Sequence, residues 1–198
     1  VVTFYGYDLS MLPVSQPKWK LRYYELFAEA DLFFCEGPHM AKSLEALGCP
    51  SDKIRVQRLG SEVDKIHYTP RRVGTDGKIK ILIVGSFREK KGIPVALTAI
   101  AHIYPHYPNV EVTIIGDAGS QAREKQEKDK ILEVIQHHKL QPIVNIMVYQ
   151  PQHMMLEEAY KHHIFLSPSV TASNGDTEGG APVTIIEMSA SGMPIVST

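Results

Sequence analysis

The sequence predicts an α/β protein built on doubly wound parallel sheets. Short runs of β-branched and aromatic residues alternate with helical patterns along the chain, which is the order of βα units. The run 81–84 is continuously apolar, as in a strand buried on both faces of a parallel sheet. A polar segment rich in helix and strand breakers, residues 68–78, separates two such series. We therefore expect two α/β parts, over residues 1–70 and 71–198.

In the first part, each predicted strand but the last is followed by a helix. Strands are predicted at 1–4, 31–35 and 54–59, and helices at 19–29 and 39–47. Gly48 follows the second helix, where a left-handed residue commonly ends a helix.

The second part repeats the pattern more fully. Strands are predicted at 80–85, 110–115, 144–148, 164–166 and 195–197, and helices at 94–104, 120–138, 153–160 and 182–191. The mixed charges of residues 123–130 predict a solvated helix face. The turn 116–119 is most simply a tight strand-to-helix connection in which Asp117 caps the helix.

Composition excludes several classes of protein. The 198 residues are 43% hydrophobic and 22% charged, which excludes a disordered or collagen-like chain. The net charge of -1 removes the basic field of a dedicated nucleic-acid binder. Two isolated cysteines favour a reducing, cytoplasmic setting over a disulfide or zinc framework. Because the chain opens and closes on predicted strands and lacks a starting Met, we expect it to be an internal fragment.

A glycine turn with three cations follows the first strand of the second part. Gly85 and Ser86 begin this turn, and Arg88 and Lys91 precede the next helix. Cations beside a helix N-terminus form an anion site, for which a diphosphate is a natural ligand. The segment matches neither the P-loop nor the three-glycine dinucleotide fingerprint. Taken alone, it is equally compatible with a solvated basic turn.

A second group of candidates lies around the predicted helix 182–191. Gly179, Gly180 and Ala181 precede Pro182, and the glycines would let backbone N–H groups approach a ligand closely. Glu178 lies at the start of this helix and Glu187 lies inside it. Carboxylates in these places can accept hydrogen bonds from sugar hydroxyls, while N–H groups of the first helical turn face a phosphate.

Together these motifs resemble the family 4 retaining glycosyltransferases, also called group 1, which have the GT-B fold. The resemblance rests on the segments 81–85, 89–93, 115–117, 167–169 and 178–198, and the segments 2–8 and 30–48 are also similar to the family. It implies that residues 1–70 are the end of an N-terminal acceptor-binding Rossmann-like domain with the crossover. Residues 71–198 would be a C-terminal nucleotide-sugar-binding Rossmann-like domain, truncated at its end.

The resemblance also implies roles for the candidate residues. Lys91, with Arg88, would bind the donor diphosphate, Glu187 the ribose hydroxyls and Glu178 the transferred sugar. Gly85, Ser86, Gly179, Gly180 and Ala181 would complete the donor site. No metal or cofactor is implied; the donor would be a UDP- or GDP-linked sugar and the acceptor a carbohydrate or a lipid-linked one. The enzyme would be cytoplasmic, with the inner face of the membrane as an alternative place.

Three positions depart from the family pattern. Tyr5 stands where the family has His, and Ser86 where it has Arg. Glu178 and Glu187 are nine positions apart, where the family has eight. Arg88 can replace the missing arginine, and the two glycines after Glu178 can absorb the extra residue. A phenol at Tyr5 donates to a hydroxyl but does not carry the charge of an imidazolium.

Two further patterns have structural explanations. Adjacent histidines such as His137 and His138 point apart on a helix, and no cysteine or carboxylate completes a metal site. The aromatic residues between Trp19 and Phe27 are typical of core packing with a solvated edge; a surface that faces a membrane or an acceptor is the alternative.

The leading hypothesis is transfer of a sugar from a nucleotide diphosphate sugar to an acceptor hydroxyl with retention, in polysaccharide or glycolipid biosynthesis. Two alternatives remain: a non-catalytic module that keeps the nucleotide site, and a nucleotide-sugar epimerase. We expect the isolated chain to be inactive, because residues 1–60 lack most of the sheet of their domain.

Overall fold

The computed structural model describes residues 1–178, 180 and 182–198, and these residues form two compact units. One unit comprises Val1–Gly60 with Thr171–Val183. The other comprises Ser61–Val170 with Thr184–Thr198. The assignment of residues 1–70 and 71–198 to an acceptor domain and a nucleotide-sugar domain stays a prediction.

The first unit contains a parallel three-stranded sheet in the order β1-β2-β3. Its core is aromatic: the rings of Phe27 and Phe33 meet edge to face with centroids 5.2 Å apart. Gly48, which follows the helix 38–46, has a φ of +99°, as predicted. The strands are β1 (Val2–Thr3), β2 (Phe33–Cys35) and β3 (Ile54–Val56), and the helices are α1 (Gly6–Ser10), α2 (Leu12–Ser15), α3 (Lys18–Glu29), α4 (Pro38–Ala46) and the short 3-10 helix η1 (Ser51–Lys53).

Helix α3 packs one aromatic face into this core, as its sequence predicts. Tyr23 and Phe27 are buried, whereas Tyr24 is 58% exposed. Three elements differ from the prediction. The strand β3 ends at Val56 rather than at residue 59, and α1 and α2 occupy a stretch for which the sequence predicts no helix.

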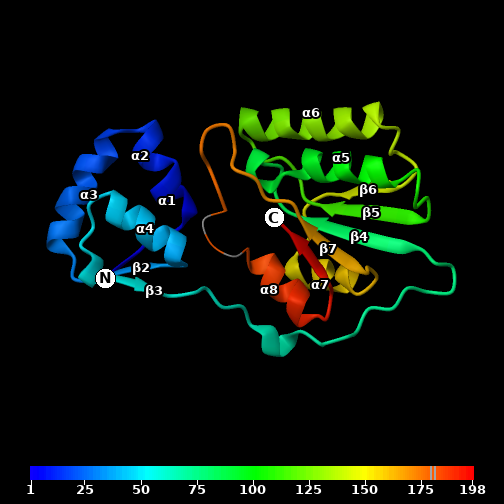
Figure 1. Ribbon diagram of the computed structural model, residues 1–198, viewed down its shortest axis with the longest axis horizontal. Coiled ribbons are helices and arrows are strands. Elements are labelled where there is room, and N and C mark those ends of the chain that lie inside the picture. The colour runs from blue at the N-terminus through cyan, green and yellow to red at the C-terminus, as the bar shows by residue number, and fades with distance from the viewer. Residues whose placement is uncertain (179, 181) are drawn as a thin grey trace. The chain divides into compact units, whose positions relative to one another are not determined.

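The second unit is a doubly wound parallel sheet, which confirms the predicted fold class. Its strand order is β6-β5-β4-β7-β8, and every neighbouring pair is parallel. Helices α5 and α6 cover one face and α7 and α8 the other (Figure 1). The strands are β4 (Ile79–Val84), β5 (Val110–Ile115), β6 (Val144–Met147), β7 (Ile164–Ser167) and β8 (Ile195–Ser197); the helices are η2 (Val63–Lys65), η3 (Glu89–Lys91), α5 (Ile93–Ile103), α6 (Ala122–His137), α7 (Gln152–Ala159) and α8 (Val183–Ala190).

The apolar run in β4 is explained by burial on both faces. Ile81 and Ile83 belong to the hydrophobic core that includes residues of α5 and α6. Leu82, which points the other way, belongs to the core that includes residues of α7 and α8. Because successive side chains of a strand alternate between faces, both cores require apolar residues here.

Helix α6 is less solvated than its mixed charges predict. Glu124 and Glu127 are only 7% and 4% exposed, so the predicted solvated face is wrong at these two positions. Each carboxylate is paired: Glu124 with Arg88 at 3.0 Å and Glu127 with Lys130 at 3.5 Å. Pairing reduces the desolvation cost that an isolated buried charge would have.

The breaker-rich segment 68–78 is entirely described, and none of its residues belongs to a helix or a strand, as predicted. The segment belongs to the second unit and packs against its other elements. The guanidinium of Arg71 donates to the backbone oxygen and the hydroxyl of Ser191 at 3.0 and 2.9 Å, and it lies 5.1 Å from the ring centroid of Tyr160. Burial lowers the pKa of Arg71.

Candidate functional site

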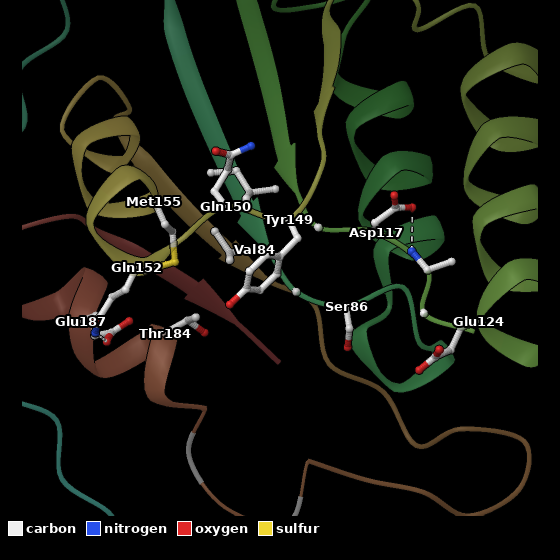
Figure 2. Close-up of a pocket in the computed structure, with 15 residues that line it drawn as sticks. Val84, Ser86, Asp117, Glu124, Tyr149, Gln150, Gln152, Met155, Thr184 and Glu187 are labelled. Atoms are coloured by element: carbon white, nitrogen blue, oxygen red, sulfur yellow. Dashed lines mark hydrogen bonds between the residues drawn. The ribbon is translucent and has the colours of Figure 1, made fainter. Parts of the chain in front are cut away.

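A pocket of about 550 Å³ opens at the carboxyl ends of β4 and β5 in the second unit (Figure 2). Strand β4 lies between β5 and β7, so the strand order reverses here. Ligands of open α/β sheets bind outside the carboxyl ends of the strands at such a switch point. The lining comes from three strand ends and three helices: Val84, Gly85, Ser86, Ile115, Gly116, Asp117, Ala118, Gly119, Glu124, Tyr149, Gln150, Gln152, Met155, Thr184 and Glu187.

Two glycines allow the backbone turns of this lining to approach each other. Gly116 has a φ of +155°, and a Cβ added there would lie 1.9 Å from the carbonyl oxygen of Gly85. A Cβ added at Gly85 would lie 3.2 Å from Cδ of Lys91. The side chain of Lys91 therefore runs along the pocket lining at Gly85.

The turn that carries Lys91 leads directly into α5. Gly92 is the N-cap of this helix and has a φ of +60°. A Cβ at this position would lie 1.8 Å from the carbonyl oxygen of Pro168, so only glycine fits. The positive end of the α5 dipole thus adjoins the cationic turn, which favours an anion.

Glu187 projects from α8 into the pocket lining and is 3% exposed. Its Oε1 accepts hydrogen bonds from Oγ of Ser61, at 3.3 Å, and from Nε2 of Gln152. Figure 2 shows the Gln152 contact. A carboxylate held in this way presents a fixed acceptor to a hydroxyl-bearing ligand.

Asp117 does not cap α6, contrary to the plain interpretation of its turn. The N-cap of α6 is Gln121. The carboxylate of Asp117 instead accepts from Nζ of Lys128 at 2.6 Å and from the N–H of Ala118 at 2.7 Å. These hydrogen bonds, that of Lys128 above all, hold the pKa of Asp117 below its usual value, so this acid is ionised and paired.

The structure brings five of the predicted site residues together. Gly85, Ser86 and Glu187 line one pocket. Lys91 reaches this lining through its contact with Gly85, and Arg88 reaches it through an ion pair with the pocket residue Glu124.

Two other predicted site residues, Glu178 and Gly180, lie in the segment just before α8. This segment belongs to the first compact unit. Within that unit, a Cβ at Gly180 would overlap the carboxylate of Glu36, and a Cβ at Gly6 would lie 3.3 Å from the carbonyl oxygen of Glu178. Burial, with a contribution from Asp8, raises the pKa of Glu36. Tyr5 is 49% exposed and donates its N–H to Asp8 at 2.9 Å. Gly179 and Ala181 lie outside the described residues.

Sequence reasoning missed several residues of the pocket. Tyr149 is 80% exposed, and in Figure 2 its ring lies between Glu187 on one side and Ser86 on the other. Gln152, which bonds Glu187, also follows β6. The rule that residues after each strand are candidates would have found both, had it been applied to the third strand of this sheet.

The rings of His137 and His138 meet edge to face with centroids 4.7 Å apart, so the expectation that these side chains point apart is wrong. The adjacent histidines at 162 and 163 each have a backbone partner. His162 is 3% exposed, and its Nδ1 lies 2.9 Å from the carbonyl oxygen of Glu158. Nδ1 of His163 accepts the N–H of Lys80 at 2.8 Å. Among the described residues there is no group of three or more His, Cys, Asp or Glu side chains arranged to hold a metal ion. None of the helices described is long and apolar enough to cross a bilayer.

The sequence profile of the family described as "Glycosyl transferases group 1" matches residues 69–198, which include the whole pocket except its Ser61 contact. The chain belongs to this family. Among curated glycosyltransferases, it is 33% identical over 198 residues to the amylovoran biosynthesis glycosyltransferase AmsK of Erwinia amylovora. It is 32% identical over 199 residues to WcaL of Escherichia coli (strain K12), a protein named for colanic acid biosynthesis.

The alignments with AmsK and WcaL cover 100% and 98% of this chain but 46% of each relative. The chain thus spans about half the length of the curated relatives it matches. Anabaena Alr3699/HepE, solved in complex with UDP-glucose, superimposes with a TM-score of 0.78 at 15% identity, over 99% of this chain and 52% of that one. Sucrose-phosphate synthase from Thermosynechococcus elongatus gives 0.73 at 18% identity, over 99% and 49%. These similarities confirm the predicted GT-B fold.

Proposed function

We propose that the chain is part of a retaining glycosyltransferase that transfers a sugar from a nucleotide diphosphate sugar to an acceptor hydroxyl in exopolysaccharide biosynthesis. The observation that carries this proposal is the pocket at the switch point of the second sheet. It combines a buried carboxylate, Glu187, with a glycine turn whose lysine, Lys91, lies along the lining. A nucleoside diphosphate requires both an acceptor for ribose hydroxyls and cations for phosphate.

In this proposal, the donor is oriented by the two ends of the pocket. Glu187 accepts hydrogen bonds from the ribose hydroxyls, and its contacts with Ser61 and Gln152 fix its direction. Lys91 and Arg88, together with the N-terminus of α5, bind the diphosphate. These groups neutralise the charge that grows on the leaving diphosphate as the glycosidic bond breaks, which is the main electrostatic demand of the reaction.

The reaction itself breaks the bond between the anomeric carbon and the diphosphate oxygen. The acceptor oxygen forms its bond to the same face of the anomeric carbon, and its proton passes to the departing phosphate oxygen. No protein nucleophile takes part in this route. Glu178 holds hydroxyls of the transferred sugar, a role that rests on the resemblance of its sequence context to the family. The proposal requires no metal or cofactor.

The names of the relatives support the choice of substrate class. Colanic acid and amylovoran are the products named for WcaL and AmsK, so we propose a carbohydrate or lipid-linked acceptor. HepE was solved with UDP-glucose, which favours a UDP-linked donor over a GDP-linked one. A cytoplasmic enzyme at the inner face of the membrane would meet both substrates.

The test uses the full-length protein with a panel of UDP- and GDP-linked sugars. Thermal protection identifies the donor, and donor consumption with and without added acceptor measures the reaction. Proton NMR of the product gives the configuration at the anomeric carbon, which we expect to match that of the donor. Protection without turnover would favour the non-catalytic module, and conversion of the donor sugar without acceptor would favour an epimerase.

A further inference from the structure

The Glu124 carboxylate poses an electrostatic problem for the proposed donor site. Glu124 lines the pocket from the first turn of α6, and its side chain is 10% exposed. A buried anion beside a diphosphate would weaken diphosphate binding by like-charge repulsion. A buried carboxylate beside a diphosphate site therefore requires a neighbouring cation that offsets its negative charge.

Arg88 is that cation. Its Nε lies 3.0 Å from Oε1 of Glu124, a charge-assisted hydrogen bond between residues on two different segments. The two partners differ in exposure: the Arg88 side chain is 48% exposed and that of Glu124 only 10%. The buried partner is thus the fixed one, and it orients the more exposed guanidinium. This contact uses Nε and does not use the terminal amino groups of Arg88.

The turn after β5 is shaped around the same carboxylate. A Cβ added at Gly119 would lie 2.3 Å from Oε2 of Glu124. Gly119 therefore provides the space that the carboxylate occupies. In Figure 2, Glu124 and Ser86 lie on the same side of the pocket, and the hydrogen bond from Arg88 places the carboxylate beside the turn after β4.

We propose that Glu124 is a positioning residue that holds Arg88 in the orientation required to bind the donor diphosphate. The inference rests on the proposed function. It assigns to α6 a part in the donor site, and it explains why a glutamate is buried within a helix segment whose sequence predicts solvation.

The same helix offers a matched control. Glu127 is also buried, at 4% exposed, and it pairs with Lys130 of its own helix at 3.5 Å. The substitutions Glu124→Gln and Glu127→Gln therefore remove one buried negative charge each from neighbouring turns. Only the first alters a partner of Arg88.

The experiment is a double-mutant cycle in the full-length protein, with UDP and GDP titrated by calorimetry, each against its monophosphate. We expect Glu124→Gln to weaken diphosphate binding at least about fivefold and monophosphate binding less than about twofold. In the Arg88→Ala background the same substitution should cause no further loss. Gly119→Ala displaces the carboxylate without removing it, and it should weaken diphosphate binding as Glu124→Gln does. Glu127→Gln should bind the diphosphate as the wild type does.

Two results would overturn the inference alone. One is wild-type diphosphate affinity in Glu124→Gln, and the other is an equal loss with and without Arg88. Failure of the wild-type protein to bind either diphosphate would instead overturn the proposed function, and the inference with it.

Discussion

Replacement of Lys91 by Ala tests the cationic end of the pocket. The aliphatic part of the Lys91 side chain runs along the pocket residue Gly85, with Cδ 3.2 Å from where a Cβ would stand. A charge-assisted hydrogen bond contributes about 1.5 to 3 kcal/mol. Because 1.4 kcal/mol is a factor of ten in affinity, we expect the Kd for a nucleoside diphosphate to rise by roughly 10- to 150-fold.

The assay is calorimetric titration of the full-length protein with UDP and with UMP. The UMP affinity should change less, because UMP lacks the diphosphate that we assign to Lys91, Arg88 and the N-terminus of α5. Lys90→Ala changes the net charge equally from the preceding position and serves as the control. Gly85→Ala, which crowds the Lys91 side chain, should cause a smaller loss of UDP affinity. An unchanged Kd in Lys91→Ala, or an equal loss in Lys90→Ala, would refute the assignment.

The remaining predictions concern both candidate glutamates, a turn glycine and a buried histidine. Glu187→Gln should weaken UDP binding because an amide is a poorer acceptor for ribose hydroxyls, whereas Glu178→Gln should lower turnover and leave UDP binding nearly intact; equal binding losses in calorimetry would contradict this division. Gly92→Ala should lower the free energy of unfolding by about 2 kcal/mol or more, since φ is +60° and its Cβ would overlap a backbone carbonyl oxygen. Gly175→Ala, with a φ of +85° in open space, should have a smaller effect in the same denaturant titration. Burial lowers the pKa of His162 from the unfolded value of 6.5, so the stability it contributes is complete above that pH and falls as the pH drops below it. The unfolding free energy of His162→Gln should depend less on pH between 7 and 5, and an unchanged dependence would contradict the assignment.

The sheet of the second unit was predictable because its strands carry a strong local signal. Ile81, Leu82 and Ile83 must all be apolar, since their side chains enter two cores on opposite faces. The role of Gly48 was equally predictable, because a glycine directly after a helical pattern commonly ends the helix in a left-handed conformation. The structure has this residue at φ +99°. In contrast, α1 and α2 are five and four residues long, with Pro13 inside the second. Helices this short have no full period of apolar residues to detect.

The burial of Glu124 could not be predicted because its partner is distant in sequence. Arg88 lies 36 residues away, and the space for the carboxylate comes from Gly119 in a third segment. The local pattern around Glu124 is an alternation of charges, which is typical of solvated helices. Only the folded chain shows that one face of this pattern turns inward.

The candidate site was predictable in its parts and not in its connections. The resemblance indicated Lys91 and Glu187 from their local motifs. The hydrogen bonds of Glu187 to Ser61 and Gln152 join segments 126 and 35 residues apart from it. Such contacts depend on how α7, α8 and the segment before η2 pack together, which the local motifs do not show.

A crystal structure of the full-length protein with UDP, or with GDP if that nucleotide binds instead, tests the central claim most directly. We predict that the ribose hydroxyls lie within hydrogen-bond distance of the Glu187 carboxylate and that the phosphates lie against Gly85, near the Nζ of Lys91 and the N-terminus of α5. A nucleotide bound with its ribose away from Glu187, or bound outside the pocket of the second sheet, would contradict it.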